Sequence, residues 1–222
     1  MRFFVLIVFV LTFFFVPHRL SAAMDSPPAI NNPPVSTGTL FGNRGMYFQM
    51  LVNKKLQSAP RIGFFSVTSL VGEWDRQEIS DLMTQGSVTF SLTSRLDFAA
   101  GFHVTPFTGF KPSAGLIYSY ADPTWLLVIN PRADLTNNGS IEGFTLLEYK
   151  PPISESWRFF SRLQVLYGFN PRSGDHARSY LVARAGLNYR EFTFGVGANI
   201  DYYGPVRRNE NNIGVFLSVQ LF

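Results

Sequence analysis

Apolar and polar side chains alternate along several short segments of this chain. In 192–203 the alternation is unbroken, with Phe192, Phe194, Val196, Ala198, Ile200 and Tyr202 on one side and Thr193, Gly195, Gly197, Asn199 and Asp201 on the other. Because successive side chains of a β-strand point to opposite faces, this period predicts a strand with one apolar face. The same pattern recurs in 86–94 and 96–105, so the chain is predicted to be all-β.

Alternating segments recur from Arg61 to the last residue. We predict ten strands, at 61–74, 86–94, 96–105, 113–121, 124–135, 140–150, 157–170, 178–189, 192–203 and 212–222. The connections alternate between short turns and longer polar loops, an asymmetry that outer-membrane barrels show. The fold class predicted for 61–222 is therefore a transmembrane antiparallel β-barrel of about ten strands, with eight or twelve strands as alternatives.

The first 23 residues have the pattern of a secretory signal peptide. Arg2 precedes an apolar run over 3–16, and the small residues Ser21, Ala22 and Ala23 follow. The run is shorter than the about 20 residues that a membrane-spanning helix needs. We therefore predict a signal peptide at 1–23, cleaved after Ala23, and an outer-membrane location.

The next segment, 24–60, is rich in Pro, Asn, Ser and Gly. This composition predicts an irregular N-terminal periplasmic arm or plug. Its one apolar stretch, 46–52, fits three alternatives: a strand, a short helix packed into the barrel mouth, or a plug.

Composition narrows the class of protein. The chain has no cysteine, which excludes a lipoprotein anchor, disulfide bonds and thiolate chemistry. Aromatic residues make up 16%, with 23 Phe, against 15% charged residues, as a lipid-facing wall requires. Loss of Arg2 and Arg19 with the signal peptide lowers the net charge from +4 to +2, so the charge gives no reason to expect a nucleic-acid partner.

Aromatic residues gather near the ends of the predicted strands, where a barrel meets the two membrane interfaces. The predicted membrane girdle consists of Trp74, Phe107, Trp125, Tyr149, Trp157, Tyr167, Phe169, Tyr189, Phe192, Tyr202 and Tyr203. The terminal Phe222 resembles the C-terminal signal that the barrel-assembly machinery reads. Outer-membrane lipid and that machinery are therefore expected partners.

Three stretches carry a resemblance to known proteins: FAAGFHVTPFTGFKPSAGLIYSYADPTWLLVINPRADLTNNGSIEGFTLLEYKP, FTFGVGANIDYYGP and NENNIGVFLSVQLF. Together they resemble a family of small exported barrels of Bacteroidetes-type bacteria, over roughly 95–222. These motifs are strand and loop signatures, so the resemblance implies a fold and a location and no activity.

The polar positions of the strands would line the barrel lumen. The predicted lumen-facing network consists of Asp97, Asn130, Arg132, Asp134, Glu142, Glu148, Arg158, Arg162, Gln164, Arg184, Asn188, Asn199 and Asp201. In a narrow barrel such carboxylates and guanidinium groups neutralise one another and fill the interior. The alternative is a charged pathway or a shallow site for a small polar solute.

The sequence thus predicts a structural or narrow solute-channel role, with a lumen largely filled by charged side chains. The competing class is an outer-membrane enzyme acting on lipid or peptide at the barrel rim. His103 and His176 are the histidines left after processing, and general-base geometry would require an acid or Ser within about 3 Å of His103. No cofactor is expected, and two isolated histidines give no metal-ligand spacing.

Overall fold

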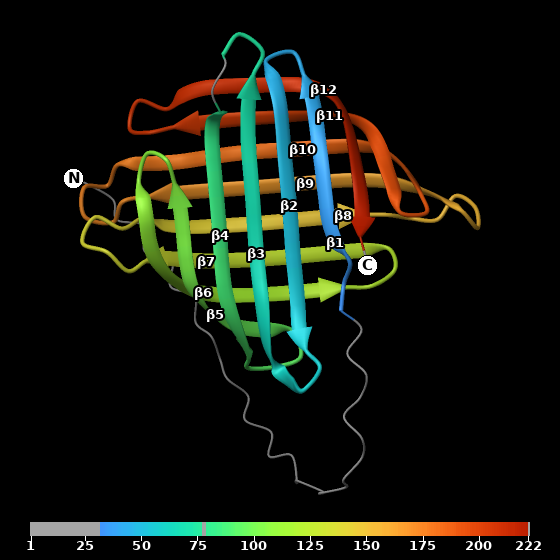
Figure 1. Ribbon diagram of the computed structural model, residues 1–222, viewed down its shortest axis with the longest axis horizontal. Helices are drawn as coiled ribbons and strands as arrows, with labels where there is room; N and C mark the ends of the chain where they lie inside the picture. The colour runs from blue at the N-terminus through green and yellow to red at the C-terminus, as the bar shows by residue number, and fades with distance from the viewer. Residues whose placement is uncertain (1–31, 77–78, 222) are drawn as a thin grey trace, which may run out of the picture.

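The computed structural model describes residues 32–76 and 79–221 (Figure 1). These residues form twelve strands: β1 (Val35–Gly42), β2 (Gly45–Leu56), β3 (Ala59–Glu73), β4 (Ile79–Ser91), β5 (Leu96–Thr105), β6 (Gly109–Ala121), β7 (Trp125–Asp134), β8 (Ile141–Tyr149), β9 (Trp157–Phe169), β10 (His176–Tyr189), β11 (Phe192–Tyr203) and β12 (Arg208–Leu221). The predicted signal peptide and Phe222 lie outside the described residues.

The strands form one closed antiparallel barrel. Each strand pairs with its neighbours along the chain, and β1 pairs with β12 from Val35↔Leu221 to Gly42↔Gly214. Closure pairs both chain-terminal strands, so the described wall presents no free strand edge.

The strand number is therefore twelve, the alternative count, and the prediction of ten was wrong. Residues 35–56, which the sequence suggested as an irregular arm or plug, form β1 and β2 of the wall, and the ambiguous 46–52 is a strand. A tight connection, Asn43-Arg44, links the two strands. The main partner of β1 is β12 at the other end of the chain, so no local pattern revealed it.

Three strands begin at least four residues earlier than expected. β4, β6 and β12 start at Ile79, Gly109 and Arg208, inside segments that were predicted to be loops. The side chains in these segments also point alternately inward and outward, and some of the polar ones face the lumen. The expected contrast between short turns and long loops is consequently absent: the connection 150–156 is at least as long as 135–140 and 170–175 at the opposite end.

We call the end that carries the connections 43–44, 106–108, 135–140, 170–175 and 204–207 the mouth end. The opposite end, where β1 begins and β12 finishes, is the terminal end. In Figure 1, β2, β3 and β4 run across the front of the molecule and β7 to β11 cross behind them, so two walls face each other over the lumen.

The facing walls fill the middle of the lumen with apolar side chains. Three clusters of buried residues lie there: Phe65, Val67, Met83, Ala99, Ile117, Val128 and Leu146; Leu40, Tyr47, Phe160 and Phe216; and Leu166, Tyr180 and Val182. Because facing walls interdigitate like packed sheets, apolar residues can seal the interior without charge. Charged side chains lie mainly toward the two ends of the lumen, and at mid-depth Arg162 and Arg184 adjoin the apolar clusters, so the filling by charged side chains that the sequence suggested remains a prediction.

The outer face is apolar. Large exposed side chains include Phe64, Val88, Phe98, Leu116, Leu147, Leu163, Val165, Leu187, Phe194, Val196, Ile213, Val215 and Leu217. They belong to most strands of the wall. Among residues 32–76 and 79–221 we find no helix long and apolar enough to cross a bilayer.

Candidate functional site

A cavity of about 330 Å³ opens inside the barrel at the mouth end, and we call it the vestibule. Its charged and aromatic lining comprises Asp81, His103, Phe107, Lys111, Arg132, Glu142, Arg178, Tyr180, Tyr203 and Arg208. These side chains come from β4 to β12, so the vestibule exists only when the barrel is closed. The volume is at the lower end of the range for ligand pockets.

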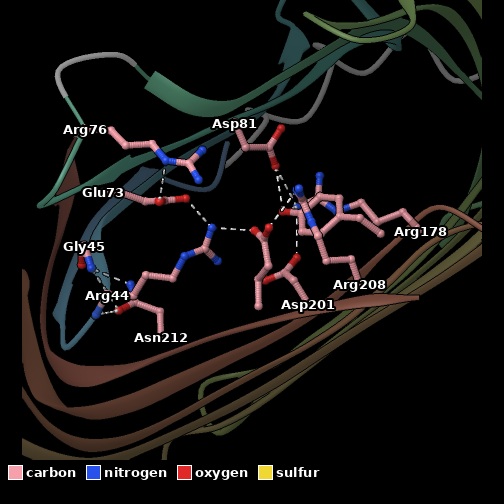
Figure 2. A network of polar contacts seen from close by, with 11 residues as sticks. Arg44, Gly45, Glu73, Arg76, Asp81, Arg178, Asp201, Arg208 and Asn212 are labelled. Carbon is pink, nitrogen blue, oxygen red and sulfur yellow. Dashed lines mark hydrogen bonds and ion pairs between the residues drawn. The ribbon is translucent and has the colours of Figure 1, made fainter. Parts of the chain in front are cut away.

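Arg178 on β10 binds groups on both walls of the vestibule. Its Nη2 lies 2.9 Å from Oδ1 of Asp201, 2.9 Å from Oη of Tyr203 and 3.1 Å from Oδ2 of Asp81. The Tyr203 hydroxyl in turn donates to Oδ2 of Asp81 over 2.9 Å. Asp81 is on β4, across the lumen from β10 and β11, so this network ties the facing walls together (Figure 2).

A second network holds the β1–β2 connection against the wall (Figure 2). Arg44 forms ion pairs with Glu73 on β3 and Glu210 on β12. The side chain of Asn212 accepts hydrogen bonds from the backbone N–H groups of Arg44 and Gly45 and donates to the Gly45 carbonyl. Gly45 fits because a Cβ there would lie 2.1 Å from the carbonyl oxygen of Gly72. The mouth end is therefore braced by charge pairs on several strands.

Arg132 reaches across the vestibule floor. Its Nε donates to Oε2 of Glu142 over 3.0 Å, its Nη2 contacts the same oxygen, and its Nη1 donates to Oε1 of Gln85 over 2.9 Å. Glu142 lies on the neighbouring β8, whereas Gln85 lies on the facing β4. The Arg132–Glu142 pair is one case of the neutralisation between carboxylates and guanidinium groups that the sequence suggested.

His103 faces the vestibule beside Asp134 and Lys111. Its Nδ1 is 3.7 Å from Oδ1 of Asp134, and Nζ of Lys111 is 3.4 Å from Oδ2 of the same carboxylate. Neither His103 Nδ1 nor Asp134 Oδ1 has a hydrogen-bond partner among the described residues. The 3.7 Å separation does not meet the distance of about 3 Å that a general base requires, so the enzyme alternative gains no support here.

The terminal end carries a separate charged layer. Glu148 pairs with Arg162 and, over 2.9 Å, with Nζ of Lys150. Lys55 lies 3.5 Å from Asp97 and donates to Ser91. Acidic and basic groups are thus largely paired at this end too.

The predicted network residues all occupy the inward face, yet they do not form one cluster. Asn130, Gln164 and Asn199 are nearly fully buried at mid-depth. Arg158 donates to the carbonyls of Pro123 and Lys150 at the terminal rim, and Asn188 donates to the 190–193 turn. The network therefore has charged layers toward the two ends of the lumen, while Asn130, Gln164, Asn199, Arg162 and Arg184 lie between them beside the apolar clusters.

The predicted girdle residues lie near the strand ends. At the terminal end Trp125 packs on Tyr149 with ring centroids 4.3 Å apart, and Trp157 packs on Tyr189 at 4.7 Å. Phe192 is exposed at the same end, whereas Trp74, Phe107, Tyr167, Phe169 and Tyr202 lie toward the mouth. Tyr203 is a correction: it follows the outward Tyr202, so it points inward, to Arg178 and Asp81.

Sequence reasoning missed Arg44, Glu73, Asp81 and Arg178. The first lay in the predicted arm, and Asp81 lay in a predicted loop. Arg178 was detectable, because it has the same parity as Arg184 in its strand. Its contact with Asp81 could not be predicted from the alternation along β10, because Asp81 lies on the facing wall.

Comparisons with known proteins give the following. No family model matches the chain, and no curated protein matches it. Among solved structures it is similar to a KdgM porin, at 9% identity and a TM-score of 0.44 over 85% of this chain and 99% of that one. It is also similar to a NanC porin, at 13% identity and a TM-score of 0.47 over 86% and 99%.

Proposed function

We propose that the protein is an integral outer-membrane β-barrel whose vestibule admits small polar solutes to a lumen that is closed at mid-depth. The observation that carries the proposal is a closed wall, apolar outside, with charged layers at both ends of its interior. A barrel satisfies all backbone hydrogen bonds within its wall, which is what hydrocarbon demands of a spanning structure. The aromatic rings at both rims fit the two interfaces.

The apolar middle supports a lumen that conducts poorly. Phe160 on β9 and Phe216 on β12 lie with ring centroids 5.8 Å apart, and both are about 4% exposed. Leu40 and Tyr47 complete the same cluster. Ions crossing this layer would have to give up their hydration, so it acts as the closed point of the lumen.

Export and assembly complete the proposal. The signal peptide at 1–23, the assembly signal at Phe222 and contact with the assembly machinery remain predictions from the sequence. The resemblance to small exported barrels of Bacteroidetes-type bacteria supports the location and remains a prediction as well.

Planar-bilayer recording of the purified protein tests the closed lumen. We expect low conductance for the unmodified barrel and higher conductance for the double variant Phe160→Ala/Phe216→Ala. The matched control is Phe159→Ala, since Phe159 is 39% exposed on the outer face and does not reach the lumen. Large, steady conductance in the unmodified protein would overturn the closed lumen, and recovery in the soluble periplasmic fraction would overturn the membrane location.

A further inference from the structure

A second, smaller cavity of about 20 Å³ lies in the lumen, apart from the vestibule. We call it the arginine pocket, and its polar lining consists of Ser36, Thr39, Tyr47, Gln49, Arg162, Arg184 and Ser218. Phe160 and Phe216 are among the apolar residues that cover its other sides. Electrostatic interactions are strong in such a setting because little water screens them.

Two guanidinium groups meet at the arginine pocket. Arg184 on β10 is directly opposite Arg162 on β9 in the register of the two strands. Like charges at directly opposite positions repel. Glu148 offsets the charge of Arg162, which it holds through an ion pair. The positive charge of Arg184 therefore makes the pocket electropositive.

Arg184 is bound only by neutral acceptors in the described part of the chain. Its Nη1 donates to the carbonyls of Ala183 and Ala198 at 2.9 and 3.0 Å, and its Nη2 donates to Oδ1 of Asn199 over 2.7 Å. No ion pair to Arg184 is present among residues 32–76 and 79–221. A partly buried cation without an anionic partner is costly, and a bound anion would relieve that cost.

The wall shape keeps the Arg184 side chain at this position. A Cβ on Gly197, the cross-strand partner of Arg184, would lie 2.5 Å from Cδ of Arg184. Glycine at 197 therefore makes room for the side chain to lie across β11. The guanidinium is positioned by backbone carbonyls, Asn199 and this gap, which is how a preformed site is built.

Hydroxyl groups supply further donors. The Ser36 hydroxyl accepts from Nε2 of Gln220, so its own hydrogen is available to donate, and the Tyr47 hydroxyl accepts from Nε2 of Gln49 and also forms a hydrogen bond with Ser69. Guanidinium and hydroxyl groups together are suited to an anion. A volume of about 20 Å³ holds one species of about the size of a water molecule, which excludes sugars, phosphate and peptides.

We propose that the arginine pocket binds one small inorganic anion of the size of chloride, held by Arg184 and Arg162 with hydroxyl donors from β1 and β12. This goes beyond the proposed function, because it concerns a structural ion in the lumen wall and requires neither transport nor an open channel. The bound anion neutralises the like-charged pair and stabilises the closed barrel.

Thermal unfolding of the full chain, folded in detergent, tests the site. Sodium chloride replaces sodium gluconate at constant ionic strength, since gluconate is too large for the pocket. We expect the unfolding midpoint to rise with chloride until it saturates in the unmodified protein and in Arg172→Gln, and to be independent of chloride in Arg184→Gln. Arg172 is a matched control because it is an exposed arginine of the 170–175 connection and lines neither the vestibule nor the arginine pocket.

An equal rise in Arg184→Gln, or no difference between chloride and gluconate in the unmodified protein, would show that the pocket holds only water and would overturn the proposal. If Arg184→Gln does not fold, crystals of the unmodified protein soaked in bromide decide the matter. An anomalous peak in contact with the Arg184 guanidinium supports the site, and its absence refutes it.

Discussion

An arginine at Val196 should destabilise the barrel strongly if the outer face lies in lipid. Val196 is 62% exposed near the middle of β11, and its cross-strand neighbours Val215 and Ala185 are uncharged. A cation on the lipid face at mid-depth costs about 2–4 kcal/mol, and the cost falls to about 0–1 kcal/mol near the interfaces. Val196→Arg should therefore lower the folding equilibrium constant by about 30-fold to 1,000-fold.

An arginine on the same outer face, but closer to the end of the strand, provides the control. Tyr202 lies on the same outer face of β11 near the mouth end and is 38% exposed, so Tyr202→Arg should cost far less. Val196→Leu controls for the change in side-chain size. Unfolding by guanidinium from phospholipid vesicles, followed by tryptophan fluorescence, gives the three free energies. Equal losses for the two arginine variants, or no loss for Val196→Arg, would refute a lipid-facing wall.

Three further predictions concern the polar groups. Glu142→Gln should lower the free energy of unfolding by about 3–5 kcal/mol, because the buried Arg132 loses its charge partner. The control Glu155→Gln, at an exposed position, should change that free energy by less than about 0.5 kcal/mol, and equal effects would contradict the burial of the pair. Arg178→Met should lower the unfolding temperature more than Tyr203→Phe, which removes one hydroxyl and leaves the Arg178–Asp81 ion pair; thermal melts that rank them the other way would contradict the bridging role. Hydrogen bonds from the backbone N–H groups of Thr124 and Trp125 lower the pKa of Asp122. The stabilisation of this turn should therefore be present above the pKa of the carboxyl in the unfolded chain and be lost as pH falls through its lower pKa in the folded chain. An NMR titration that gives Asp122 a normal or raised pKa would contradict this.

The sequence predicted the outer wall well because lipid and lumen impose opposite demands on neighbouring residues. β5 and β11 match their predicted spans, since every second side chain there is apolar and most of these are exposed. β1 gave no such signal. Five of its eight residues are Gly, Ser or Thr, and its long pairing is with β12.

For the site, the sequence predicted which side chains face the lumen, but not which of them make contact across it. Inward-facing residues such as Arg132 and Arg162 could be read from alternation, and their cross-strand partners Glu142 and Glu148 followed from adjacency. Contacts across the lumen depend on how the walls face each other, which alternation does not encode. The Arg178–Asp81 bridge and the apolar middle were therefore not predictable in this way.

The pairing of β1 with β12 also means that the barrel can close only after its last strand has been made. The first strand to leave a ribosome or translocase must wait for the last before its outer row of N–H and C=O groups is paired. Contacts between residues this far apart in sequence form slowly. Until then, the growing sheet exposes two unpaired edges and an apolar face at once, a combination that promotes aggregation. A chain built in this way folds safely only where both edges and the apolar face stay covered until β1 and β12 can meet.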